Sequence, residues 1–507
     1  MLDFGMETKR ICDIITRGAA TRMNDVEFLE KEVGKFIASP MRKMMIDGDM
    51  YYDYEQAVRV KQRVVISEEN TLITDPRLPN NRFCDNQYAV MVDQKVNYLL
   101  SKPVTFKTDN AAYADALRKV MDKSFKRTLK NVGKDSYNGG IGWMYPYYDE
   151  TGAFKIKRFH PWEILPFWND DDHTELDFAV RVYTVLAYEG KEEKKKQFVE
   201  VYDTKGIHRF EYESGKLIPD YSISYFELKT YTNPEDPDMV EGYNWNRVPL
   251  IPFRANSTET PLIKKCKELQ DGINQILSDF GDGMQENASG NSILVIHNYG
   301  GTDLGEFRRN LMTYRAVKVE NVDNKDGGID TLTIEVNGEN YKAVLQELRK
   351  ALIQNCKGYD VEELKSSGSP NEMTIKAIFS AIDMDANEIE TEDQASFEQL
   401  LWFVNMHLLN TGAGNFTDEE VDVIFNRDMM VNESQIITDC RNSVCLISQK
   451  TIIANHPWTV DPDAEMEQLM KENEEKIEQY QGAFAGKPDA GEDDDDIDDD
   501  LPEDDEN

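Results

Sequence analysis

Apolar residues recur along the chain at two different periods, and the change of period divides it into regions. Residues 1 to about 135 have a largely helical pattern. In "DNQYAVMVDQKVNYLLSKPVTF", for example, Val92, Val96 and Leu99 fall at helical spacing and Pro103 ends the pattern. From 136 to 256, short β-branched and aromatic runs such as "AFKIKRF" alternate with turns. This second pattern predicts a meandering β region.

Two heptad-like seams predict a pair of helices after the β region. Thr260 is suited to cap the first helix and Pro261 to occupy its first position. Lys357 and Gly358 predict the end of the second helix, as a cation and a glycine C-cap. The seam residues are Leu262, Cys266, Leu269, Ile273, Ile276 and Phe280 in the first helix, and Tyr341, Leu345, Leu348 and Leu352 in the second. Such seams pack helices side by side, so we expect two antiparallel rods with a small α/β insert, about 291 to 337, at their far end.

A third helix is predicted after the stretch "KSSGSPNE", residues 365 to 372. Between Pro370 and Asn410 there is neither a glycine nor another proline, so this helix could reach about 60 Å. Ser369 fits the N-cap, Pro370 the first helical position and Glu372 the third, which together form a capping box. Residues 413 to 480 are expected to be a further helical region, followed by a tail.

The seams alone leave two arrangements open. The rods could pack within one chain as a bundle. Alternatively, each rod could bury one side within the chain and the other side against a neighbouring copy, in a closed ring.

Charge adds a constraint on partners. The chain carries 95 acidic and 57 basic side chains, a net charge of −38. Twelve of the acids lie in residues 491 to 507, an expected disordered block, and removing them still leaves −26. Such a chain does not favour tight nucleic-acid binding, but it is compatible with DNA that slides past without sticking.

The sequence contains no recognisable catalytic motif. It has no glycine-rich phosphate loop, no HExxH or GxSxG motif and no CxxC pair, so we expect no enzyme activity, cofactor or metal. The stretch "WNDDDH", residues 168 to 173, has the residue types of a metal-dependent nuclease, although a solvated turn explains it as well. No stretch is typical of a signal peptide or a membrane span, which predicts an intracellular protein.

Four segments resemble portal proteins of tailed bacteriophages, of the type found in siphophages of Gram-positive hosts. The segments occur in the same order as in that family. They are "NNRFCDNQYAVMVDQKVNYLLSKPV" (80–104), "FHPWEILPFWNDDD" (159–172), "RVPLIPFRANS" (247–257) and "LISQKTIIANHPWTVDPDAEMEQLMKENEE" (446–475). The resemblance implies an α+β portal fold that assembles into a ring, usually of twelve copies, at one vertex of the capsid.

The resemblance also implies a division of the chain into named parts. The expected parts are a wing (1–256, β-rich from about 136), a first stem helix (257–290), a clip (291–337), a second stem helix (338–358), a tunnel loop (359–369), a long wing helix (370–410), a crown (411–480) and a disordered acidic tail (481–507).

The implied function is a channel for genome packaging and ejection. Double-stranded DNA would pass through without sequence specificity, and terminase, scaffold, major capsid and head-completion proteins would be partners. The protein would assemble in the host cytoplasm and reside in the virion. The loop residues expected nearest the DNA are Glu363, Leu364, Lys365, Ser366, Ser367, Gly368 and Ser369. Two alternatives remain: a metal-dependent DNA-processing enzyme that uses Asp170 to His173, and a non-viral acidic scaffolding protein.

Overall fold

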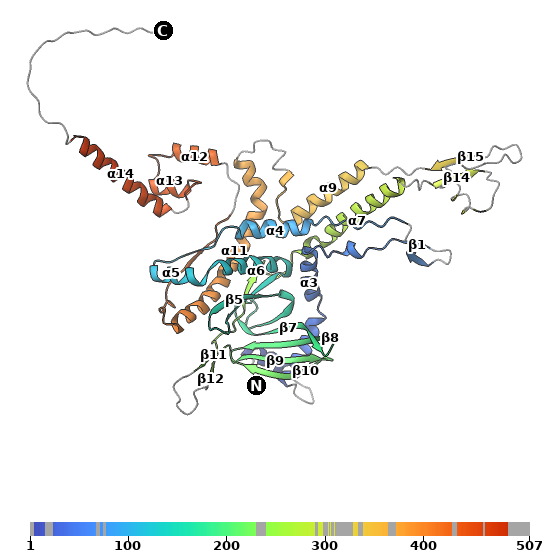
Figure 1. Cartoon of the computed structure of the whole chain (residues 1–507), viewed down its shortest axis with the longest axis horizontal. Helices are drawn as coiled ribbons and strands as arrows, with labels where there is room; N and C mark the ends of the chain where they lie inside the picture. The colour runs from blue at the N-terminus through green and yellow to red at the C-terminus, as the bar shows by residue number, and fades with distance from the viewer. Residues whose placement is uncertain are drawn as a thin grey trace, which may run out of the picture. The chain divides into compact units, whose positions relative to one another are not determined.

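The computed structural model describes residues 5–15, 24–66, 71–74, 78–229, 240–288, 293–297, 303, 305, 309, 328–332, 338–362, 372–427, 433–459 and 462–484. The chain divides into two compact units (Figure 1). Unit 1 comprises residues 1–369 and 376–429, and unit 2 comprises residues 370–375 and 430–507.

Short helices with well-formed caps build the N-terminal part of unit 1. They are α1 (Met6–Ile15), α2 (Asp25–Ile37), α3 (Pro40–Tyr52), the 3-10 turn η1 (Ala57–Val60), α4 (Gln87–Leu100), α5 (Ala111–Val120) and α6 (Lys123–Gly139). Asn24 and Glu27 form a capping box at the start of α2, with bonds of 2.8 and 3.1 Å. Gly140 ends α6 at φ 82°, and a Cβ there would lie 2.0 Å from the Glu259 carbonyl oxygen, so the position requires glycine.

The predicted β meander is confirmed, although it starts at Ile141 rather than near 136, because α6 continues to Gly139. Five consecutive strands form one antiparallel sheet in the order β10-β9-β8-β7-β6. Their bounds are β6 (Ile164–Trp168), β7 (Leu176–Glu189), β8 (Glu192–Asp203), β9 (Gly206–Glu213) and β10 (Lys216–Ile223).

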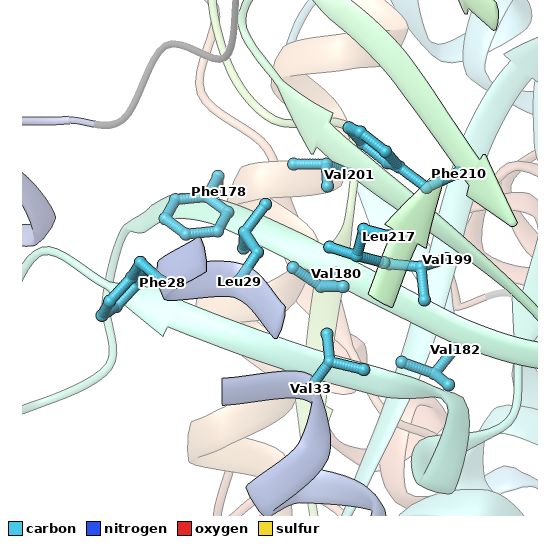
Figure 2. Close-up of a cluster of buried hydrophobic side chains, with 10 residues drawn as sticks. All are labelled: Phe28, Leu29, Val33, Phe178, Val180, Val182, Val199, Val201, Phe210 and Leu217. Carbon is cyan, nitrogen blue, oxygen red and sulfur yellow. The ribbon is translucent and has the colours of Figure 1, made fainter. Parts of the chain in front are cut away.

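Helix α2 covers one face of this sheet and forms a core with it (Figure 2). Leu29 and Val33 of α2 are fully buried against alternate residues of the strands. The buried members of this cluster are Phe28, Leu29, Val33, Phe178, Val180, Val182, Val199, Val201, Phe210 and Leu217. The members of the cluster alternate along β7 and β8, as side chains on one face of a strand do, while Ala179 and Tyr202 on the other face are buried as well.

A second sheet has three strands, in the order β13-β4-β5: β4 (Ile141–Tyr148), β5 (Phe154–Phe159) and β13 (Ile251–Arg254). The remaining described strands form two-stranded antiparallel sheets. They are β1 (Val64–Ile66) with β2 (Leu72–Thr74), β11 (Phe226–Lys229) with β12 (Val240–Tyr243), β14 (Ile293–His297) with β15 (Gly328–Leu332), and β3 (Thr105–Lys107) with β16 (Asp422–Ile424).

The long helix α11 spans Glu372–Asn410 as one element of 39 residues. Phe397 of α11 is fully buried among four aromatic rings from other elements. Those rings are Phe106, Phe125, Phe253 and Phe425, with centroids 5.6, 6.4, 5.6 and 5.9 Å away. Aromatic pairs at these separations fix α11 onto the body of unit 1.

The expectation of a purely helical region from 413 to 480 is wrong for its first part. Strand β16 lies there and pairs with β3, so this segment belongs to unit 1. Unit 2 contains α12 (Glu433–Asn442), α13 (Gln449–Asn455) and α14 (Pro462–Phe484). Taken together, helices and several antiparallel sheets confirm the predicted α+β class. Among the described residues, no helix combines the length and apolar character needed to cross a bilayer.

Candidate functional site

The two helices that carry the predicted seams lie side by side. They are α7 (Ile263–Ala288) and α9 (Gly338–Asn355) (Figure 1). The Phe280 and Tyr341 rings meet with centroids 5.2 Å apart, and Gly272 faces Leu348. The two helices therefore touch at the far end of the seam and near its middle.

The seam side chains are only partly covered within one chain. Leu262, Cys266, Ile273 and Leu352 are buried. The other six, Leu269, Ile276, Phe280, Tyr341, Leu345 and Leu348, keep intermediate exposure. Within a single chain, each of these six side chains thus keeps a minor part of its surface accessible.

Helix α7 begins later than the sequence suggests. Thr260 and Pro261 precede the helix, which starts at Ile263. The Asn256 side chain bonds both the backbone N–H and the carbonyl of Thr260, at 2.9 Å each, and the Leu262 N–H donates to the Tyr137 carbonyl at 2.9 Å. These bonds hold the segment outside helical geometry, so Thr260 does not act as the cap.

A different face of α7, polar and buried, binds an extended segment of the chain. Side chains four residues apart on α7 each accept a hydrogen bond from a backbone N–H between residues 81 and 88. The pairs are Asp282 with Asn81 (2.6 Å), Ser278 with Phe83 (3.0 Å), Asn274 with Asp85 (2.9 Å) and Gln270 with Tyr88 (2.9 Å). We call these four pairs the polar ladder.

The spacing of the polar ladder follows from backbone geometry. Four residues of helix rise by about 6 Å, and two residues of extended chain rise by about 6.6 Å. The N–H groups of Asn81, Phe83 and Asp85 therefore meet side chains at every fourth helix position, and Tyr88, three residues further on, donates from the first turn of α4. All four α7 side chains are nearly or fully buried, and each supplies a partner to a backbone donor of the segment that packs on the helix.

Buried amides extend the polar ladder to α3. Asn274 Nδ2 donates to Gln56 Oε1 at 2.5 Å. Gln56 Nε2 in turn donates to Asn86 Oδ1 at 2.8 Å, and Asn86 Nδ2 donates to the Tyr51 carbonyl at 2.9 Å. Sequence reasoning missed this network, although a signal existed: polar residues recur every four positions beside the apolar seam of α7.

The C-terminus of α9 differs from the expected glycine cap. Lys357, not Gly358, takes the left-handed conformation, at φ 53°. The Gly358 N–H bonds the Ile353 carbonyl at 2.9 Å and the Lys357 N–H bonds that of Gln354 at 3.0 Å, which is a Schellman motif. Gly358 instead lies close to α4: a Cβ there would be 2.4 Å from Met91 Sδ, so the methionine side chain would have to shift.

Helix α4 holds the elements around α9 through the "DQKV" stretch. Asp93 accepts from Tyr52 Oη at 2.9 Å and pairs with Lys134 at 2.9 Å, which ties α4 to α3 and α6. Gln94 bonds both backbone groups of Tyr359, at 3.2 and 3.4 Å. The chain that leaves α9 is therefore fixed as far as Tyr359.

Lys95, next in that stretch, is fully buried and pairs with Asp385 of α11 at 2.6 Å. Tyr137 Oη donates to the same carboxylate oxygen at 3.0 Å. Burial lowers the pKa of Lys95, and the Asp385 carboxylate opposes that shift. The pair joins α11 to α4 in the part of α11 that follows the predicted loop.

The loop residues Glu363 to Ser369 and the cap residue Pro370 lie outside the described residues. Glu372 is the first residue of α11. The loop and the capping box therefore stay predictions.

Asp170 and His173, the possible metal ligands, are engaged in other contacts. The Asp170 carboxylate accepts from the backbone N–H groups of Thr174 and Glu175 at 3.0 and 3.1 Å. His173 Nδ1 lies 2.6 Å from Glu259, and its ring stacks on Trp168. Across the described part of the chain, no group of three or more histidine, cysteine or acidic side chains could hold a metal ion.

Comparison with known proteins shows which family this chain resembles. The family model for "Phage portal protein, SPP1 Gp6-like" matches residues 43–479. The portal protein of Bacillus phage SPP1 is 29% identical over 510 aligned positions, covering 99% of this chain and 95% of the relative. The portal protein of Clostridium phage phiCD119 is 25% identical, covering 86% of this chain and 94% of the relative. The chain belongs to the SPP1 Gp6-like family of phage portal proteins.

Proposed function

We propose that copies of this chain form a ring around an axial channel at one vertex of a phage capsid, and that double-stranded DNA enters and leaves through it. Family membership supports this function. The observation that supports a ring is the difference between two faces of α7. One face is occupied by the polar ladder, while the seam with α9 keeps six apolar side chains partly exposed. A neighbouring copy on each side would cover them.

In this proposal the chain parts take the roles expected of a portal. Helices α7 and α9 form the stem, residues 291–337 the clip, and α11 the link to wing and crown. Terminase docks on the clip during packaging, and head-completion proteins replace it afterwards. ATP hydrolysis belongs to terminase, so this chain acts as a structural part. Twelve copies form the ring in the virion, after assembly in the host cytoplasm with scaffold and major capsid protein.

Electron microscopy of the purified protein tests the ring. Negative-stain images are expected to contain rings with a central hole. A monomer at every concentration, also in the presence of a scaffold protein, would overturn the proposal.

The tunnel loop has a separate test. We propose that Lys365 and its small polar neighbours face the channel, since they follow the stem and precede α11. Lys365→Ala, or deletion of residues 366–369, should leave ring assembly intact and lower the yield of packaged DNA. A normal yield would exclude the role.

A further inference from the structure

Strands β1 and β2 form a hairpin without other described strands beside them. Their register places Val64 opposite Thr74 and Ile73 opposite Val65. An isolated two-stranded hairpin is marginally stable in water. The outer edge of such a hairpin can pair with a strand of a second chain.

Apolar side chains on both faces of this hairpin are in water. Leu72 is 70% exposed, and Ile73, which points to the opposite face, is 47% exposed. Val64 is 47% exposed, and Val60, just before the hairpin, is 78% exposed. Each face of the hairpin therefore keeps exposed apolar surface.

The base of the hairpin, in contrast, is firmly attached. Lys61 Nζ lies 2.6 Å from Asp279 and 3.6 Å from Asp282 of α7. The Lys61 carbonyl accepts from Arg82 Nε at 2.9 Å and from Asn80 Nδ2 at 3.3 Å, which closes the base of the loop. The polar ladder starts directly afterwards, at residue 81. We call residues 61–66, 71–74 and 78–82 the hairpin arm.

Charge distinguishes this region from the rest of the protein. Residues 57–82 contain five basic and three acidic side chains, a net charge of +2, in a chain with a net charge of −38. Within this stretch, the described residues 57–66, 71–74 and 78–82 include Arg59, Lys61, Arg63 and Arg82 but no acidic residue. Residues 57–82 therefore carry a net charge opposite in sign to that of the whole chain, and so to that of another copy of the same protein.

We infer that the hairpin arm docks on a neighbouring copy of this chain and links adjacent subunits of the ring. This inference rests on the proposed function, because it needs a neighbour. Exposed Leu72 and Ile73 favour a protein surface over DNA phosphates, which charged and polar groups contact. The rigid base holds the strands in position before association, which lowers the ordering cost of binding.

Two matched substitutions test the docking. Leu72→Asp places a charge on the arm, and Tyr188→Asp places one at a similarly exposed site, 74% exposed, at the end of strand β7. Neither side chain is buried, so both variants should melt at the wild-type temperature. Removing one leucine contact from an interface should raise the protein concentration for half-assembly by about tenfold or more. Tyr188→Asp should leave it within about twofold of wild type.

Photocrosslinking identifies what the arm touches. With p-benzoylphenylalanine in place of Leu72, illumination of assembled protein with and without double-stranded DNA should yield covalent dimers, and peptide mapping should identify this chain as the partner. If wild type forms rings, an unchanged half-assembly concentration in Leu72→Asp, or crosslinks to DNA alone, overturns the inference and leaves the proposed function standing. If wild type never forms rings, the proposed function itself fails.

Discussion

Lys95 lies on the apolar stripe of α4, between Val92 and Val96, where a charge is costly unless it is paired. The stripe itself could be recognised from the sequence, and a lysine on it signals a buried partner. The partner, Asp385, lies 290 residues further along the chain, and no local pattern points to it. Sequence reasoning could therefore have predicted the buried cation but not the ion pair.

Removal of the Lys95 ammonium should strongly destabilise the protein. Lys95→Met leaves the Asp385 carboxylate without its nearest cation, with only Lys357 Nζ 3.8 Å away, at a cost of up to about 3–5 kcal/mol in the free energy of unfolding. Lys35→Met, at an exposed pair with Glu32, should cost less than about 1 kcal/mol. Chemical denaturation measures both, and adding Asp385→Asn to Lys95→Met should recover part of the loss. Equal losses in the two single variants would contradict the buried pair.

Asp135 gives stability a predictable pH dependence. Burial raises the pKa of this carboxyl to about 7, although Arg158 lies 2.7 Å from it and opposes the shift. Between pH 4 and 7 the folded protein holds a proton that the unfolded chain has lost, so this group's contribution to stability falls as pH rises. Relative to Asp135→Asn, wild type should lose up to about 4 kcal/mol between pH 4 and 8. A pH-independent difference between the two would refute the raised pKa.

At the scale of elements, the helices were easier to predict than their ends and contacts. The seam of α7 was visible in its apolar spacing, whereas its start at Ile263 depends on the Asn256 side chain and on Tyr137 of α6. Likewise, the sequence predicts that Gly358 is a helix cap, whereas in the structure this residue lies beside Met91 of α4. These features follow from neighbours in space, which a local pattern does not contain.

Each of the four hydrogen-bonded pairs of the polar ladder, here called a rung, should contribute separately to stability and to amide protection. Ser278→Ala removes the acceptor for the Phe83 N–H, which then lies unpaired at a cost of about 1–3 kcal/mol. Hydrogen exchange should accelerate at the Phe83 amide more than at neighbouring amides. Gln275→Ala, on the exposed side of the same helix, should change neither stability nor that amide. Unaltered exchange at Phe83 in Ser278→Ala would mean that the rung does not hold the segment.

At the scale of the whole molecule, composition and motif order predicted the α+β class and the portal family. They did not predict where the compact units divide. Strand β16 pairs with β3 although about 300 residues separate them, and this pairing brings residues up to 429 into unit 1. Strand partners are set by the assembled sheet, so the helical expectation for 413–429 had no local pattern to correct it.

Net charge should govern how readily copies associate. Truncation before Gly491 removes twelve acidic residues and changes the net charge from −38 to −26. At 50 mM salt the truncated protein should assemble at lower concentration than the full chain, because like charges repel less. At 1 M salt, where screening acts over about 3 Å, the difference should vanish. Sedimentation measures both states, and a difference that persists at 1 M salt would rule out charge repulsion as its cause.

The polar ladder also gives the protein a mechanically strong direction. A pull along the axis of α7 strains all four rungs together, as in shear, whereas a pull away from the helix breaks them one after another. The segment from 81 to 88 should therefore resist traction along α7 far better than peeling, and a single-molecule pulling experiment would record two distinct rupture forces for the two directions.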